Sequence, residues 1–118
     1  MHEFSIAESL VKAVEDELQT HNYRPDRLRT VRVRVGQMRQ VVPDTLKFAY
    51  QTLVGETAAA DSVLEIEFQP TEALCRDCKW RGPVQSHLFV CPQCDSTNLE
   101  ITAGRDLALI SMEFDEDE

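Results

Sequence analysis

The chain has 118 residues, of which 42% are hydrophobic, and this is enough for one compact domain carrying a small additional unit. Its 12 basic and 21 acidic residues give a net charge of −9, which disfavours nucleic acid as a partner because nucleic-acid-binding modules carry a basic face. No apolar run reaches the length that a membrane-spanning helix needs, so we expect no membrane partner either.

The N-terminal part of the chain has the pattern of an amphipathic helix over residues 5–20. Ser5 followed by Glu8 matches a capping box, which predicts that the helix begins at Ser5. Residues 1–4 are then expected to form a short, movable arm ahead of the helix. The apolar residues recur every three or four positions, as expected for one buried helix face: Ala7, Val11, Val14 and Leu18.

Two segments alternate between apolar and polar residues, which predicts strands with one buried face. In the first, Val31, Val33 and Val35 alternate with threonine and arginines, and Gly36 ends the strand. In the second, residues 64–69, leucine, isoleucine and phenylalanine alternate with acids and glutamine. If the two strands pair, the outward acids of the second should match the arginines of the first.

A second helix is predicted between these strands, beginning near Pro43 and Asp44. Proline suits the first turn of a helix, and an acidic residue there complements the helix dipole. The following apolar residues fall on one helix face: Leu46, Ala49, Tyr50 and Leu53. A last strand is predicted over residues 106–114, and we expect it to return beside the other two.

All four cysteines lie in two Cys-x-x-Cys turns, Cys75 to Cys78 and Cys91 to Cys94, with twelve residues between the turns. Two such turns supply the four thiolates that a tetrahedral zinc site takes. Disulfides, a redox dithiol and an iron site with the same four sulfurs are alternatives. The first ten residues lack the features of a signal peptide, so we expect a cytoplasmic, reducing location, where disulfides are rare. A four-thiolate zinc site has no open coordination position, which predicts a structural role.

These elements predict an α+β fold in which two helices pack on a three-stranded sheet, with a zinc-ribbon-like minidomain inserted between two strands. The expected domain limits are 1–72 with 103–118 for the larger domain and 73–102 for the minidomain.

The N-terminus, Met1-His2-Glu3, is a second candidate metal site. The α-amine, the amide nitrogen of His2 and its imidazole lie within chelating reach of one ion. Ni(II) or Cu(II), which can displace an amide proton, suits this donor set better than zinc. Glu3 could add an amide nitrogen or a carboxylate oxygen. A histidine also occurs at the second position by chance, and the residues alone do not separate the two interpretations.

Taken together, the segments MHEFSIAESL and VRVGQMRQVVPDTLKFAYQTL, the paired Cys-x-x-Cys turns and the C-terminal strand resemble the HypA/HybF family of hydrogenase nickel-incorporation proteins. The resemblance covers essentially the whole chain. It implies a nickel-binding α/β domain that carries a zinc-binding domain, and a nickel metallochaperone rather than an enzyme. It also implies a HypB-type GTPase and the [NiFe] hydrogenase large-subunit precursor as partners, and in some members urease accessory proteins.

Carried onto this chain, the resemblance makes His2 the principal nickel ligand, with Met1 and Glu3 completing most of the set. Asp44 is the nearest carboxylate that could complete it, or it is only an acid at a helix start. The implied zinc ligands are Cys75, Cys78, Cys91 and Cys94. Some members have a histidine directly after the last cysteine, where this chain has Asp95. Only His87 is then left as a candidate for a pH response, or it is simply a solvated residue of the loop between the cysteine turns.

Two other functions stay open at this point. One is a zinc-ribbon adaptor that only binds other proteins, in which His2 is incidental. The other is a thiol oxidoreductase that uses one Cys-x-x-Cys pair. The chain shows no phosphate-binding glycine loop and no nucleophile with an adjacent base, which favours a protein that is not an enzyme.

Overall fold

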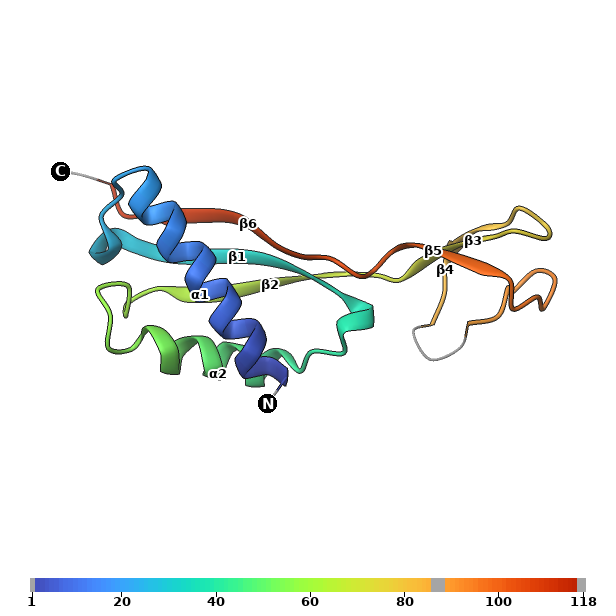
Figure 1. The fold of residues 1–118 in the computed structure, drawn as a ribbon, viewed down its shortest axis with the longest axis horizontal. Coiled ribbons are helices and arrows are strands. Elements are labelled where there is room, and N and C mark those ends of the chain that lie inside the picture. Colours follow the sequence, from blue (N-terminus) through green and yellow to red (C-terminus); the bar gives the residue numbers. More distant parts are fainter. Residues whose placement is uncertain (1, 86–88, 117–118) are drawn as a thin grey trace. The chain divides into compact units, whose positions relative to one another are not determined.

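The structure, a computed structural model, describes residues 2–85 and 89–116. Two α-helices and two three-stranded sheets form an α+β fold, as predicted (Figure 1). The chain divides into two compact units. Unit 1 comprises Met1–Arg34, Val41–Glu67 and Ala108–Glu118, and unit 2 comprises Val35–Gln40 and Phe68–Leu107. The sequence-based domain limits stay a prediction.

The first helix, α1 (His2–Thr20), begins three residues earlier than predicted. The expected arm over residues 1–4 and the capping-box start at Ser5 are therefore wrong for the described residues 2–4. Tertiary contacts explain the longer helix, because they stabilise the helical conformation of the residues ahead of Ser5. The ring of Phe4 packs edge-on against Phe48 with 6.5 Å between centroids, and the Glu3 carboxylate accepts a hydrogen bond from the Val42 N–H at 3.1 Å.

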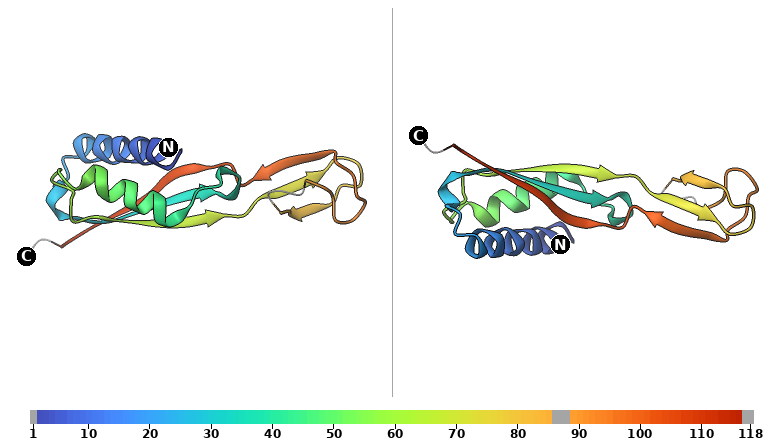
Figure 2. Two further views of the ribbon diagram at one scale, coloured as in Figure 1. Left: turned by 90° about the horizontal axis from the view of Figure 1, so that it is seen from below. Right: turned by 90° about the horizontal axis from the view of Figure 1, so that it is seen from above.

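The second helix, α2 (Pro43–Val54), packs against α1. It begins at Pro43, as the sequence predicts. In Figure 1 α1 crosses in front of β1 and β2, and in Figure 2 it lies to one side of the sheet. The two helices bury one stripe each, and these stripes form much of the core of unit 1: Ile6, Ala7, Leu10, Val14 and Leu18 from α1, and Leu46, Ala49, Tyr50 and Val54 from α2.

The first sheet consists of β1 (Leu28–Gly36), β2 (Val63–Gln69) and β6 (Leu107–Phe114), in the order β2-β1-β6. A short 3₁₀ turn, η1 (Pro25–Arg27), precedes β1. The inward side chains of β1 are fully buried: Val31, Val33 and Val35. The predicted cross-strand charge pairs are present, since Arg32 contacts Glu65 at 3.0 Å and Arg34 contacts Glu67 at 2.8 Å. These pairs confirm both the strand assignment and the outward faces.

Unit 2 contains a second sheet of β3 (Glu72–Cys75), β4 (Arg81–Pro83) and β5 (Leu99–Ala103), in the order β4-β3-β5. Both pairings are antiparallel, and Ala73 lies opposite Gly82 on one side and Ile101 on the other. These short strands carry the cysteine turns. No pattern in the sequence predicted these three strands.

The 3₁₀ turn η2 (Gln37–Arg39) joins unit 2 through close backbone contacts. The Gly36 N–H donates to the Asp106 carbonyl at 2.7 Å, and the Met38 N–H donates to the Gly104 carbonyl at 2.9 Å. A Cβ on Gly36 would clash with the Gly104 carbonyl group, so only glycine fits at this crossing.

Candidate metal sites

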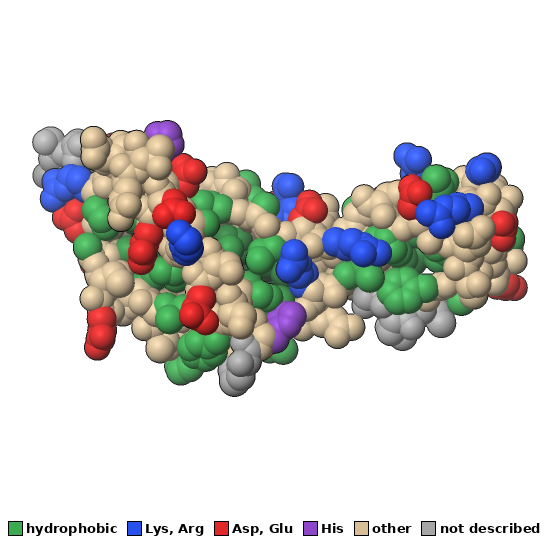
Figure 3. Space-filling model, viewed as in Figure 1, with side chains coloured by type: hydrophobic (Ala, Val, Ile, Leu, Met, Phe, Trp, Pro, Cys, Tyr) green, Lys and Arg blue, Asp and Glu red, His purple; other side chains and the backbone are tan. Residues whose placement is uncertain are grey.

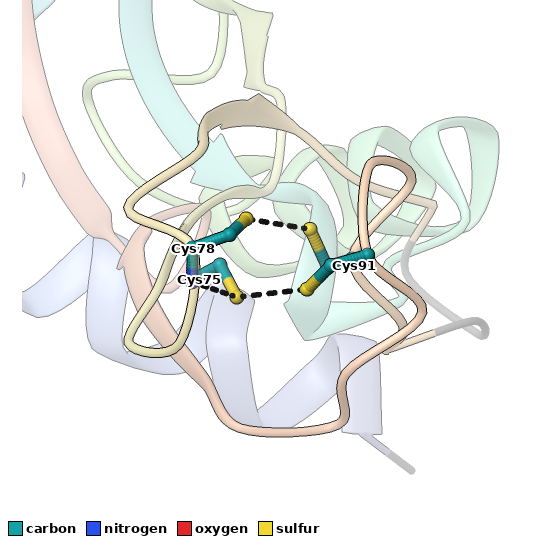
Figure 4. Close-up of side chains that lie close together, drawn as sticks. Cys75, Cys78 and Cys91 are labelled. Carbon is teal, nitrogen blue, oxygen red and sulfur yellow. Dashed lines mark hydrogen bonds between the residues drawn. The ribbon is translucent and has the colours of Figure 1, made fainter.

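The four cysteine sulfurs converge in unit 2. Cys75 ends β3, Cys78 follows in the turn toward β4, and the other two come from the loop before β5. All four sulfur atoms lie within 4.8 Å of one another, and the Cys75–Cys94 and Cys78–Cys91 pairs are each 3.6 Å apart (Figure 4). A tetrahedral site with Zn–S bonds of about 2.3 Å places its sulfurs about 3.8 Å apart, so this arrangement fits a four-thiolate metal site.

The two cysteine turns have the same local geometry. In each, the residue after the second cysteine donates its N–H to the carbonyl of the first, from Lys79 to Cys75 and from Asp95 to Cys91, both at 2.9 Å. Lys79 and Asp95 adopt left-handed backbone conformations, with φ of 68° and 62°. Such a turn folds the chain back so that both sulfurs point to one side. A backbone N–H also donates to the first sulfur, from Cys78 at 3.5 Å in one turn and from Gln93 at 3.4 Å in the other.

Polar side chains tie the two turns together beside the sulfurs. The Asp77 carboxylate accepts hydrogen bonds from the Ser96 hydroxyl and from the Asn98 side-chain amide. The backbone adds a further link, because the Arg76 N–H donates to the Asn98 carbonyl at 3.0 Å. Sequence reasoning missed Asp77. The only sequence signal is an acid inside the first turn and two small polar residues after the second.

The ionisation of the four thiols favours a bound cation. The hydrogen bond from the Cys78 N–H lowers the pKa of the Cys75 thiol to about 7. The pKa of the Cys94 thiol is raised to about 12: the Ser96 N–H favours its thiolate, but desolvation and the neighbouring sulfurs outweigh that effect. Four thiolates this close repel one another unless a positive ion lies between them. A divalent metal that takes four thiolates therefore fits these residues.

At the N-terminus, the structure places His2 in the first turn of α1, where its side chain is exposed. Met1 lies outside the described residues. The Glu3 carboxylate caps the start of α2 through the Val42 N–H, and this hydrogen bond lowers the pKa of Glu3. Asp44 lies two residues beyond Val42 in the first turn of α2. The Glu3 contact thus joins the helix end that carries His2 to the helix end that carries Asp44.

These N-terminal side chains do not form a ready-made cluster. Within the part of the chain that the structure describes, the cysteines are the only group of three or more histidine, cysteine or acidic side chains placed to hold an ion. His21, directly after α1, pairs with Glu17 at 3.2 Å. The prediction about His87 lies outside the described residues.

Comparison with known proteins decides the family. The family model described as "Hydrogenase/urease nickel incorporation, metallochaperone, hypA" matches residues 1–114. The chain belongs to the HypA family. The hydrogenase maturation factor HypA of Rhodopseudomonas palustris is 32% identical over 115 residues, which are 98% of this chain and 100% of that protein. The HypA of Beijerinckia indica is 33% identical over 113 residues, covering 96% and 98% of the two chains.

A solved structure agrees with this assignment. The solution structure of the Ni metallochaperone HypA from Helicobacter pylori is 28% identical to this chain, covers 97% of both chains and superposes with a TM-score of 0.67. HypA proteins are maturation factors, so this chain is a metallochaperone and not an enzyme. Its role implies contact with the hydrogenase maturation machinery. Neither of the described α-helices has the length and apolar character needed to cross a membrane.

Proposed function

We propose that this chain binds Ni(II) at its N-terminus and delivers it during maturation of [NiFe] hydrogenase. The proposed donors are the α-amine of Met1 and the amide nitrogen and imidazole of His2. The observation that carries the proposal is a histidine at position 2, in the first turn of α1, in a chain of the nickel-incorporation family.

The start of a helix suits a ligand set that includes backbone nitrogen. The first four N–H groups of a helix have no acceptor within the helix. Nickel can therefore displace the amide proton of His2, or that of Glu3, without breaking a helical hydrogen bond. Release follows from reprotonation of the same nitrogens, because metal binding to deprotonated donors is coupled to pH. A movable arm, which the sequence suggested, is not needed.

The contact of Glu3 with Val42 supports a division of roles around the nickel. Because the Glu3 carboxylate is occupied by the Val42 N–H, we assign its backbone nitrogen, and not its carboxylate, to the metal. Asp44 is exposed at the same end of unit 1. We assign it as the carboxylate that can complete the nickel shell.

The cysteine cluster is proposed to hold structural Zn(II), with Cys75, Cys78, Cys91 and Cys94 as its ligands. A site with four thiolates is closed to further ligands, and it stabilises the fold around it. The sulfur separations support this role, and so does the backbone hydrogen bond that the two turns share.

Delivery is proposed to involve a HypB-type GTPase and the hydrogenase large-subunit precursor, in the cytoplasm, with urease accessory proteins as further recipients. Selectivity for nickel must come from these partners and from metal supply. Affinity alone cannot provide it, because copper binds nitrogen donor sets of this kind more tightly than nickel does.

Calorimetric titration of zinc-loaded, untagged protein with Ni(II) tests the proposal. We expect His2→Ala to lose tight nickel binding and His21→Ala, which removes another exposed histidine of the same unit, to retain it. Equal nickel affinity of the His2→Ala variant and the unmodified protein would contradict the N-terminal site.

A further inference from the structure

The edge of the first sheet formed by β6 lies beside a hollow. β1 flanks β6 on one side, and no described strand pairs with its other side. A hollow of about 580 Å³ lies between β6 and the second half of α1. Four consecutive residues of β6, from Leu109 to Met112, line it. Successive side chains of a strand point to opposite faces, so a hollow that touches four in a row reaches the edge of the strand.

This edge lacks the protection that natural sheets usually carry. Exposed edges are commonly blocked by lysine, proline or other charged side chains. β6 has the sequence LALISMEF, in which Glu113 is the only charged residue and proline is absent. Ile110 is 39% exposed. The Ser111 hydroxyl, on the wall of the hollow, is buried without a hydrogen-bond partner among the described residues. The backbone edge of β6 is therefore available to an incoming chain.

The opposite wall of the hollow is acidic. Asp16 and Glu17 of α1 line it, and they are paired with Lys12 at 3.3 Å and with His21, another lining residue, at 3.2 Å. The whole helix carries five acidic residues and one lysine, and acidic side chains outnumber basic ones on the face of unit 1 shown in Figure 3. At one end of the hollow the Tyr23 ring, 48% exposed, lies 5.0 Å from the Phe114 ring. An exposed aromatic ring beside acids is a favourable contact for arginine.

We propose that the β6 edge accepts an extended segment of a partner protein as an added strand, and that the face of this segment turned toward α1 carries both apolar residues and lysine or arginine. Added strands take affinity from main-chain hydrogen bonds and specificity from alternate side chains. On that face, which carries every second side chain, the apolar residues would pack in the hollow beside Ile110, and the basic ones would face Asp16 and Glu17. A second copy of this chain fits less well, because edge-to-edge pairing would bring two acidic α1 helices together on chains that each carry a net charge of −9.

Three synthetic peptides of the length of β6 test this proposal against the zinc-loaded full chain. The first carries both valine or isoleucine and lysine or arginine on one strand face, with threonine on the other face. The second replaces the basic residues by glutamate, and the third is the basic peptide with alternate amides N-methylated. We expect only the first to bind, to shift the NMR amide signals of β6 and to slow their hydrogen exchange. The N-methylated peptide keeps the charge and loses strand pairing, so it separates docking from general attraction.

Two variants of equal charge change complete the test. Asp16→Lys should weaken binding of the first peptide by roughly tenfold, since it reverses one charge of the wall. Glu8→Lys, on α1 but outside the hollow, should leave binding within about twofold. Equal binding of the N-methylated peptide, equal effects of the two variants, or shifts confined to residues outside β6 would overturn the proposal. If the protein associated with itself through β6 and bound none of the peptides, the occupant of this edge would be a second copy of the chain and not a partner protein.

Discussion

Replacing Tyr50 by phenylalanine removes one buried hydroxyl group without changing the ring that packs in unit 1. The Tyr50 hydroxyl lies 2.7 Å from the Ser62 Oγ, which in turn donates to the Ala59 carbonyl at 2.7 Å. Ser62 has one proton to give and gives it to Ala59, so Tyr50 must be the donor to Ser62. Tyr50→Phe therefore removes a single hydrogen bond and leaves Ser62 satisfied as a donor, and it should lower the free energy of unfolding by about 1 kcal/mol.

Ser62→Ala should cost more, about 1–3 kcal/mol, because it leaves the Tyr50 hydroxyl buried without an acceptor. The double variant has no orphaned hydroxyl, so it should be no less stable than Ser62→Ala alone. Urea unfolding of zinc-loaded protein, followed by the helical signal in far-UV circular dichroism, measures all three. If Tyr50→Phe proved more destabilising than Ser62→Ala, the assigned direction of the hydrogen bond would be wrong.

The same site gives a prediction for alkaline pH. Desolvation raises the pKa of Tyr50 above its ordinary value of 10.0. The unfolded chain then releases the tyrosine proton before the folded chain does. The contribution to stability is complete below about pH 10 and is lost as the pH rises further. We expect stability to fall less steeply above pH 10 in Tyr50→Phe than in the unmodified protein, and identical slopes would contradict the raised pKa.

Three further variants test unit 2. Cys91→Ser should release zinc and abolish hydrogen-exchange protection of β3 to β5 while α1 stays protected, since small metal sites contribute roughly 10 kcal/mol or more to folding; protection of these strands without zinc would refute the structural role. Gly104→Ala should lower the free energy of unfolding by about 1–3 kcal/mol, because Gly104 has a φ of +114° and the added Cβ would lie 2.7 Å from the Thr71 Cα. Gly55→Ala is the control: this glycine has a φ of −59°, so the change in stability, measured by urea unfolding, should be less than about 1 kcal/mol. Asp77→Ala should speed zinc transfer to a chelator by roughly tenfold or more, because it removes the hydrogen bonds that link the two cysteine turns. An unchanged transfer rate would show that Asp77 does not stabilise the site.

The first sheet could be predicted because its pattern is simple. Val31, Val33 and Val35 alternate with polar residues, and a strand with one buried face is the only regular structure with that period. The matching of Arg32 with Glu65 and of Arg34 with Glu67 then followed from cross-strand pairing. The convergence of the cysteines was also predictable, since paired Cys-x-x-Cys turns have few other geometries.

Other features depend on contacts between residues far apart in the sequence. The start of α1 at His2 is supported by Phe4 against Phe48 and by Glu3 against Val42, which local capping rules do not contain. The strands β3, β4 and β5 have three to five residues each, too short for an alternating pattern to be recognised. Asp77 binds Ser96 and Asn98, which lie 19 and 21 positions further along the chain, and no sequence-spacing rule predicts such hydrogen bonds.

Adding one glycine before Met1 tests the proposal that nickel binds through the chain terminus itself. This change leaves every side chain in place and removes only the α-amine from its position beside His2. We expect calorimetry of the zinc-loaded protein to show that the extended chain has lost tight Ni(II) binding, with unchanged zinc content and an unchanged far-UV spectrum. Nickel binding by the extended chain at the strength of the unmodified protein would contradict the account.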